Sequence, residues 1–134
     1  MVPSPDEGDR KGPRIYGSRL KDCSVTDGDT IRCGDERIRL LGIDAPELPG
    51  HCRRGRTCAP GDPFAATRSM EQALSGELRI ERFGKDAYGR TLGAVRSSRG
   101  DLSCYQLQNG QALYRADWDN KNHIADACPD FAAN

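Results

Sequence analysis

Apolar and polar side chains alternate along residues 20–40, which is the two-residue period of a β-strand with one buried face. Two turn sequences, DGD at 27–29 and GD at 34–35, divide this segment into three strands. Gly42 interrupts the third strand, where a bulge or a sharp bend is expected in a small closed barrel. The segment is therefore predicted to form a three-stranded meander.

A long loop and a helix follow the meander. Residues 44–63 hold four of the eight prolines and no apolar run, and a loop of this length inside a compact domain is usually functional. Asp62 and Pro63 form an N-cap and N1 pair, and apolar residues then recur at helical spacing. A helix is therefore predicted from Pro63 until Gly76 ends it.

Two more strands and a second helix complete the predicted elements. Apolar residues alternate with others at 78–81 and at 92–96, as in half-buried strands. Asp101 is a suitable N-cap for a short helix that ends at the Asn-Gly pair 109–110. After Leu113 the chain becomes polar and irregular, and no further element is predicted there.

These elements predict an α+β domain, and five short strands with glycine bends favour a five-stranded OB-fold β-barrel with two to three packed helices. We divide the chain into a flexible leader at 1–14, a domain at 15–118 and a C-terminal tail at 119–134. No apolar run approaches the roughly 18 residues of a membrane span, so no membrane association is predicted. The protein is expected to act as a monomer.

The kinds of charged residue in the sequence are more informative than the net charge. The 20 Lys and Arg residues balance 20 Asp and Glu residues, which argues against a uniformly positive, non-specific nucleic-acid-binding surface. Arginine makes up 16 of the 20 basic residues, and its planar fork suits phosphate and carboxylate groups. Genome composition alone would also explain an arginine bias.

Six cysteines in 134 residues, with no CxxC pair, are typical of a disulfide framework. Such a framework forms in an oxidising compartment, so we expect a secreted or periplasmic protein whose signal peptide is absent from this sequence. The alternative is a cytosolic protein in which six reduced cysteines act as small hydrophobic residues.

Six cysteines allow about 15 complete pairings, and geometry favours one pair directly. If the first hairpin folds about Gly28, Cys23 and Cys33 face each other at the α-carbon distance that a disulfide needs. The other two predicted pairs would close the long loop and tie down the tail: Cys52 with Cys58, and Cys104 with Cys128.

Two clusters of carboxylates lie at the ends of the predicted strands. Asp27 and Asp29 flank the glycine of the first turn, whereas Asp44 and Glu47 follow the third strand. Carboxylates at strand ends can converge, and an incomplete set of hard oxygen ligands suits Ca²⁺ because it leaves room for water and substrate. Taken alone, the DGD sequence is explained as well by a good hairpin turn.

Two arginines accompany the carboxylates. Arg39 lies five residues before Asp44 on the same strand, and Arg90 closes the separate turn DAYGR. A pair of arginine forks facing a metal–carboxylate site suits phosphodiester cleavage, because negative charge builds up on the phosphate oxygens in the transition state. For either arginine alone, the alternative is a solvated strand face.

Three motifs, VTDGDT, IRLLGIDAPE and DAYGR, occur in this order with these separations. Together they resemble the staphylococcal nuclease (thermonuclease) family over roughly residues 15–118. The resemblance implies an OB-fold barrel with packed helices. It also implies a Ca²⁺-dependent nuclease that hydrolyses DNA and RNA with low sequence specificity and leaves 3′-phosphate ends.

The resemblance further implies roles for single residues. Asp29 and Asp44 would bind Ca²⁺ through their carboxylates, the backbone carbonyl of Ala45 would add a third oxygen, and Asp27 would lie behind these ligands. The family often has Thr at the position of Ala45, but only a backbone oxygen is needed there.

By the same resemblance, Glu47 would be the general base that orients or deprotonates the attacking water. Arg39 and Arg90 would hold the phosphate and stabilise its transition state. Tyr88 would border the nucleotide pocket, and Trp118 would replace one of two pocket tyrosines as a stacking surface.

Two departures weaken the side of the pocket that would hold the nucleotide. Ala87 stands where the family has a basic residue before the turn tyrosine, and Ala116 stands where it has the other pocket tyrosine. The basic sequence HCRRGR at 51–56 either approaches the nucleic-acid backbone or is a solvated loop.

Two other functions compete with a nuclease. A non-catalytic nucleic-acid-binding OB module would be expected to lack the carboxylates, which are all present here. A disulfide-stabilised interaction domain with a structural Ca²⁺ would explain the cysteines but would leave Arg39, Glu47 and Arg90 unused. The sequence therefore favours the enzyme.

Overall fold

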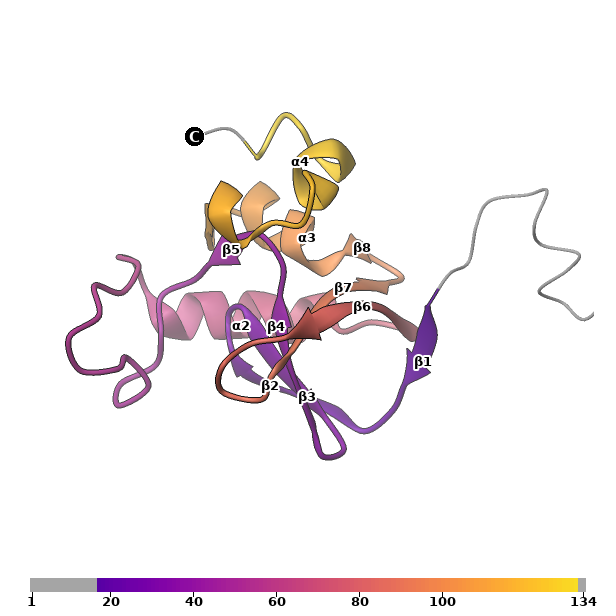
Figure 1. The fold of residues 1–134 in the computed structure, drawn as a ribbon, viewed down its shortest axis with the longest axis horizontal. Helices are drawn as coiled ribbons and strands as arrows, with labels where there is room; N and C mark the ends of the chain where they lie inside the picture. The colour runs from indigo at the N-terminus through magenta and orange to yellow at the C-terminus, as the bar shows by residue number, and fades with distance from the viewer. Residues whose placement is uncertain (1–16, 133–134) are drawn as a thin grey trace, which may run out of the picture.

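The computed structural model describes residues 17–132, so the predicted leader lies outside the described residues. A curled mixed β-sheet dominates the fold, with the strand order β1-β6-β7-β4-β3-β2 and with β8 paired to β7 (Figure 1). Its strands are β1 (Ser18–Leu20), β2 (Cys23–Asp27), β3 (Thr30–Cys33), β4 (Glu36–Leu40), β6 (Leu78–Lys85), β7 (Thr91–Ser97) and β8 (Gly100–Asp101). Only β4 and β7 are parallel neighbours among them.

Three helices within residues 17–132 pack on this sheet or on one another, which confirms the predicted α+β class. They are α2 (Pro63–Ala73), α3 (Leu102–Gln108) and α4 (His123–Ala127), and a 3₁₀ turn, η1, spans Ala116–Trp118. Helix α2 packs on β2 and on α3, α3 packs on β7, and α4 packs on α3. A separate strand pair, β5 (Ile43–Asp44) with β9 (Leu113–Tyr114), was not predicted.

The first hairpin has the predicted register. Cys23 pairs with Cys33 and Val25 with Ile31, and a bulge between Val25 and Asp27 then shifts the pairing by one residue. A Cβ atom on Gly28 would lie 2.7 Å from Ala66 Cβ and 2.9 Å from Ala45 Cβ. The turn therefore needs glycine because α2 and the end of β5 approach its backbone closely.

Both predicted helices begin at their predicted caps. The Asp62 carboxylate accepts hydrogen bonds from the N–H groups of Phe64 and Ala65, and Asp101 accepts one from Cys104. Helix α2 turns Ala66, Ser69, Met70 and Ala73 inward, which is the expected spacing of one helical face.

The chain bends at Gly42, as expected, and α4 fills the space beside the bend. Gly42 has φ +75°, and a Cβ atom there would lie 3.2 Å from the side chain of Ile124, which is completely buried. Asp119 takes the place of an N-cap for α4, since its carboxylate accepts from the N–H groups of Ile124 and Ala125. The sequence analysis assigned these residues to an irregular tail, whereas in the structure Ile124 and Cys128 of this segment are buried in the core.

One hydrophobic core joins the sheet and the helices. Its completely buried members include Ile31 and Ile38 from the sheet, Met70 from α2, Leu102 from α3 and Ile124 from α4. No helix in the described part of the chain is long and apolar enough to cross a membrane.

All six cysteines are paired, and the three predicted disulfides are confirmed. The pairs are Cys23–Cys33, Cys52–Cys58 and Cys104–Cys128. The reduced-cysteine alternative is therefore wrong for this structure, because the thiols lie close enough to bond in pairs. Three disulfides in so small a domain are typical of an oxidising compartment.

We predict that replacing Cys104 and Cys128 together with Ser destabilises the protein by about 3 kcal/mol and loosens α4. The bond joins residues 24 apart, and opening a loop of this length restores chain entropy to the unfolded state. Urea unfolding measures the loss, and hydrogen exchange at 123–128 measures the loosening.

The matched control is the double Ser variant at Cys52 and Cys58, which opens a loop of only 6 residues and should cost about 2 kcal/mol. An equal or larger loss in this control, or unchanged exchange protection in α4 when Cys104 and Cys128 are replaced, would contradict the prediction.

Candidate active site

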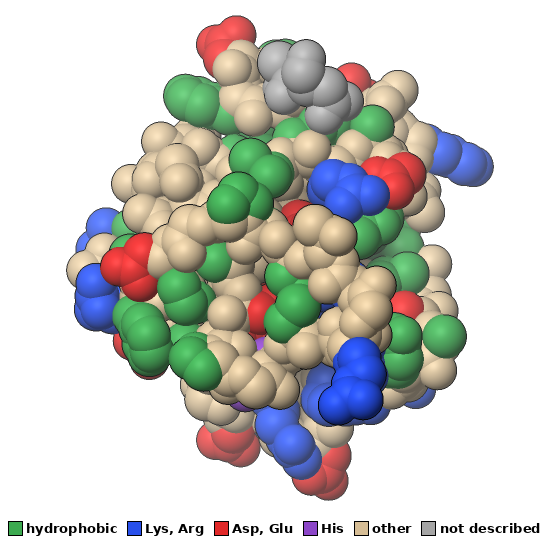
Figure 2. Space-filling model, turned by 90° about the vertical axis from the view of Figure 1, so that its left-hand side faces the viewer, with side chains coloured by type: hydrophobic (Ala, Val, Ile, Leu, Met, Phe, Trp, Pro, Cys, Tyr) green, Lys and Arg blue, Asp and Glu red, His purple; other side chains and the backbone are tan. Residues whose placement is uncertain are grey.

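A cavity of about 780 Å³ opens between the long loop 45–62, the hairpin ends and the turn before β7. The loop projects at the left of Figure 1, and Figure 2 views the molecule from that side. Basic side chains, with some acidic ones among them, stand out around the lower part of this face, and a small acidic area lies recessed near its centre. The cavity lining includes Asp27, Arg39, Glu47, Arg56, Tyr88, Arg90 and Trp118.

Asp29 and Asp44 lie behind this lining and contact the same guanidinium group. Arg39 Nη2 is 3.5 Å from Asp29 Oδ2 and 4.0 Å from Asp44 Oδ1. The N–H of Ala45 donates to Asp29 Oδ2 at 2.8 Å, which ties the β2–β3 turn to the end of β5. The structure thus brings the predicted metal ligands Asp29, Asp44 and Ala45 together.

Burial shifts the pKa values of Asp44 and Arg39 in opposite directions. Desolvation raises the pKa of the Asp44 carboxyl, and nearby Asp29 raises it further, while Arg56 and Arg39 oppose both effects. Desolvation also lowers the pKa of the Arg39 guanidinium, and Asp29 opposes that shift. The ion pairs offset part of the cost of burying these charges in a site that is nearly closed to water.

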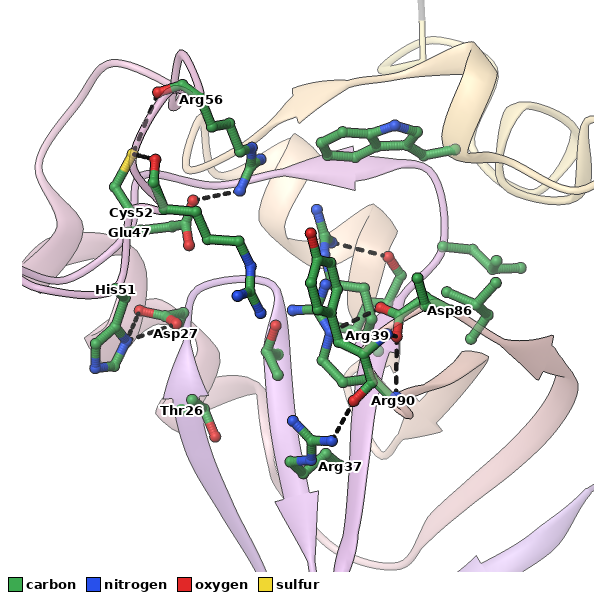
Figure 3. Close-up of a pocket in the computed structure, with 18 of the residues that line it drawn as sticks. Thr26, Asp27, Arg37, Arg39, Glu47, His51, Cys52, Arg56, Asp86 and Arg90 are labelled. Carbon is green, nitrogen blue, oxygen red and sulfur yellow. Dashed lines mark hydrogen bonds and ion pairs between the residues drawn. The ribbon is translucent and has the colours of Figure 1, made fainter.

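Arg90 lines the same cavity from the turn just before β7. Its Nε donates to Asp86 Oδ2 at 2.8 Å, and Asp86 Oδ1 also accepts from the N–H groups of Tyr88 and Arg90 (Figure 3). Asp86 therefore fixes the turn and the side chain together. Arg90 is also one of the groups that lower the pKa of Arg39, so the two predicted phosphate-binding arginines lie close enough to repel each other.

Glu47 lines the cavity and is held by an arginine that the sequence analysis did not single out. Arg56 Nη1 donates to Glu47 Oε2 at 2.5 Å, and Arg56 Nη2 donates to Asp44 Oδ1 at 3.1 Å. Burial raises the pKa of the Glu47 carboxyl, and Arg56 opposes this shift. The basic sequence HCRRGR was the one signal for Arg56, and it did not distinguish a site residue from a solvated loop.

Asp27 positions the loop instead of contacting Arg39. Its carboxylate accepts from the N–H of Leu48 at 3.0 Å, and both of its oxygens lie 2.9 Å from His51 Nδ1 (Figure 3). The contact with Leu48, next to Glu47 in the chain, fixes the backbone at this end of the loop. Asp27 itself lines the cavity, and its predicted role behind the metal ligands stays a prediction.

The two predicted stacking residues both contact arginines. The Arg53 guanidinium lies 3.6 Å from the Tyr88 ring centroid, and the half-exposed Tyr88 borders the cavity. Arg115, Arg39 and Arg56 lie 4.2, 4.8 and 5.4 Å from the Trp118 centroid. Trp118 therefore packs against the arginines of the site, a role that the sequence did not indicate.

The oxygen donors fit a hard divalent cation. The buried carboxylates of Asp29 and Asp44 share one guanidinium, and the charge of Asp29 raises the pKa of the Asp44 carboxyl, a like-charge repulsion that a cation would relieve. Glu47 also lies with the sulfurs of Cys52 and Cys58 within 4.8 Å. Because these sulfurs are joined in a disulfide, they offer no thiolate for zinc.

The fold and the cavity define an OB-like α+β domain with buried carboxylates beneath a layer of arginines. The family model of the staphylococcal nuclease homologue matches residues 37–129. The chain belongs to this family.

Curated relatives agree with this assignment. The succinoglycan biosynthesis protein ExoI of Rhizobium meliloti is 36% identical over 107 residues, which cover 78% of this chain and 56% of the relative. The thermonuclease of Staphylococcus intermedius is 38% identical over 80 residues, covering 53% of this chain and 44% of the relative. An uncharacterized endonuclease of Haemophilus influenzae is 31% identical over 93 residues, covering 66% of this chain and 47% of the relative. The chain spans about half the length of these relatives.

A buried amide supports the acidic turn from below. Gln106 on α3 is completely buried, and its Nε2 donates to the carbonyl oxygens of Gly28 at 2.7 Å and Ala66 at 3.0 Å. Its Oε1 accepts from Ser69 Oγ at 2.5 Å. One side chain therefore joins α2 and α3 to the residue between Asp27 and Asp29.

We predict that Gln106→Leu destabilises the protein by about 3 kcal/mol, because it leaves two buried carbonyls and a hydroxyl without their donor or acceptor. The matched control is Gln108→Leu, the same change at an exposed position of α3. Urea unfolding of both variants tests this, together with hydrogen exchange at 27–29. An equal loss for the two variants would show that Gln106 does not support the turn.

Proposed function

We propose that this protein is a Ca²⁺-dependent nuclease that hydrolyses phosphodiester bonds of DNA and RNA with low sequence specificity and leaves 3′-phosphate ends. The observation that carries the proposal is the convergence of two buried carboxylates, one carboxylate at the cavity wall and two arginines at one end of the sheet. The names thermonuclease and endonuclease among the relatives support the same activity. We also propose that the protein acts as a secreted or periplasmic monomer.

In this proposal, Asp29, Asp44 and the Ala45 carbonyl hold Ca²⁺, which supplies Lewis-acid polarisation of the phosphate. Glu47 removes a proton from the attacking water. Its desolvation favours this role, because a carboxylate with a raised pKa is a stronger base.

Arg39 and Arg90 hold the phosphate and stabilise the charge that develops on its oxygens. Their mutual proximity supports this role, since an anion between them relieves their repulsion. Arg39 is oriented by bonds from its Nη1 to the carbonyl oxygens of Leu40 at 3.2 Å and Ile43 at 2.9 Å. Tyr88 and Trp118 then border the bound nucleotide.

The main competing function is a nucleic-acid-binding OB module without catalysis. It shares the cavity and the arginines but does not require Glu47. Incubation of plasmid DNA and of RNA with Ca²⁺, and in parallel with excess chelator, separates the two functions. Cleavage that requires Ca²⁺ supports the enzyme, whereas binding without cleavage supports the module.

We predict that Glu47→Gln lowers turnover of DNA by 10² to 10⁴-fold with a small effect on nucleotide binding, because the amide cannot accept the proton from water. Initial rates in saturating Ca²⁺ measure the loss. Glu71→Gln, at an exposed position of α2, is the control and should retain full activity. A loss of only about twofold for Glu47→Gln would exclude Glu47 as the general base.

We predict that Arg39→Lys lowers turnover by at least about 10²-fold, because an ammonium group cannot replace a planar fork that faces two carboxylates and two carbonyls. Circular dichroism and thermal unfolding check that the variant folds. Arg99→Lys, at an exposed turn, is the matched control and should leave turnover unchanged. Near-normal activity of a folded Arg39→Lys variant would remove Arg39 from the proposed mechanism.

A further inference from the structure

Arg56 covers the acidic groups of the site from the cavity side. Its guanidinium donates to Asp44 Oδ1 at 3.1 Å. It also donates to Glu47 Oε2 at 2.5 Å, the contact drawn in Figure 3. Arg56 lines the cavity, whereas Asp44 is 3% exposed and is absent from the described lining. A group entering from the cavity therefore meets Arg56 before it meets Asp44.

Arg56 and a divalent cation would compete for the same carboxylate oxygen. Calcium–oxygen distances are about 2.3–2.6 Å, so a cation on Asp44 Oδ1 would lie within a few ångströms of the guanidinium now held there. Like charges at such distances repel strongly in a partly buried site. The contact between Arg56 and Asp44 is therefore incompatible with full occupancy of Asp44 by a cation.

The loop restricts how far Arg56 can move when it leaves Asp44. The Cys52–Cys58 disulfide closes a short ring that contains Arg56, and the Arg56 N–H donates to the Arg53 carbonyl at 3.1 Å inside this ring. The Trp118 ring lies 5.4 Å from the guanidinium. A displaced Arg56 side chain therefore stays in the cavity, beside Glu47.

We propose that Arg56 is a third phosphate-binding residue, which neutralises Asp44 while no cation is bound and turns to the substrate phosphate when a divalent cation takes its place. This inference rests on the proposed function. In this inference, the disulfide ring keeps the Arg56 guanidinium close to both of its anionic partners, first the Asp44 carboxylate and then the substrate phosphate. A guanidinium suits both, because its planar fork binds carboxylate and phosphate alike.

The first test measures Ca²⁺ binding by calorimetry, without substrate. Arg56→Gln should bind Ca²⁺ about tenfold more tightly than the unchanged protein, because the competing positive group is gone. Arg54→Gln removes an exposed arginine from the same loop and should change the affinity by less than about twofold. Unchanged or weaker Ca²⁺ binding by Arg56→Gln would overturn the inference.

The second test measures binding of adenosine 5′-monophosphate in saturating Ca²⁺. Arg56→Gln should weaken this binding at least about fivefold, while Arg54→Gln should leave it nearly unchanged. Opposite effects on the two ligands are the signature of a residue that changes partners, since a folding defect would weaken both. Unaltered nucleotide binding by Arg56→Gln would exclude Arg56 as a phosphate ligand.

A third variant tests the ring. In the otherwise unchanged protein, replacing Cys52 and Cys58 together with Ser should tighten Ca²⁺ binding. In a protein that also carries Arg56→Gln, the same replacement should have no further effect on Ca²⁺ binding. A further effect in that background would show that the ring acts independently of Arg56 and would overturn this part of the inference.

The inference and the proposed function fail in different ways. If the unchanged protein cleaves DNA only with Ca²⁺ but Arg56→Gln leaves Ca²⁺ affinity as it was, only the inference about Arg56 is wrong. If the unchanged protein binds no Ca²⁺, the proposed Ca²⁺ dependence and the inference are both wrong.

Discussion

The site depends on the ion pairs that the Arg39 guanidinium makes with Asp29 and Asp44. All three side chains are nearly closed to water, and a buried charge without a partner is strongly destabilising. The pairing of Thr30 with Arg39 in β3 and β4, together with the bond from Arg39 Nη1 to the Ile43 carbonyl, keeps the guanidinium in place. Secondary structure thus sets the geometry of the charges, and the charges in turn require this strand register.

Polar and covalent links around the charged site supplement a small hydrophobic core. Gln106 joins two helices to the acidic turn, and Asp119 joins η1 to α4. Disulfides fasten the first hairpin, the long loop and the last helix. These links hold segments that have few apolar side chains of their own, which is a common solution in small domains of oxidising compartments.

The distribution of charge over the cavity suits a polyanionic substrate. Carboxylates lie at the base, and arginines from different elements lie above them: Arg39 from β4, Arg56 from the long loop and Arg90 from the turn before β7. Asp44 is also approached by Arg115 at 3.7 Å, so its single charge faces several positive groups. Such a site has a positive entrance and an acidic base, which allows an anion and a hard cation to bind side by side.

Local sequence signals determined much of the fold. The caps Asp62 and Asp101 predicted the two helices. The alternating strands and the turn about Gly28 predicted the hairpin register, and the register in turn predicted the Cys23–Cys33 pair. Each of these features depends on interactions between near neighbours in the chain. The three motifs likewise predicted which carboxylates and arginines to expect together. The structure brings them together, while their catalytic roles stay predictions.

Only the tertiary structure revealed the parallel contact of β4 with β7, helix α4 and the bridge made by Arg56. Helix α4 has no cap signal next to it, since Asn122 is left-handed and the capping carboxylate belongs to Asp119. Arg56 lies in a loop without periodicity, which also contains Arg53 and Arg54. Each of these features depends on groups that the fold brings together in space, and no local pattern of residue types records which of several similar side chains will meet.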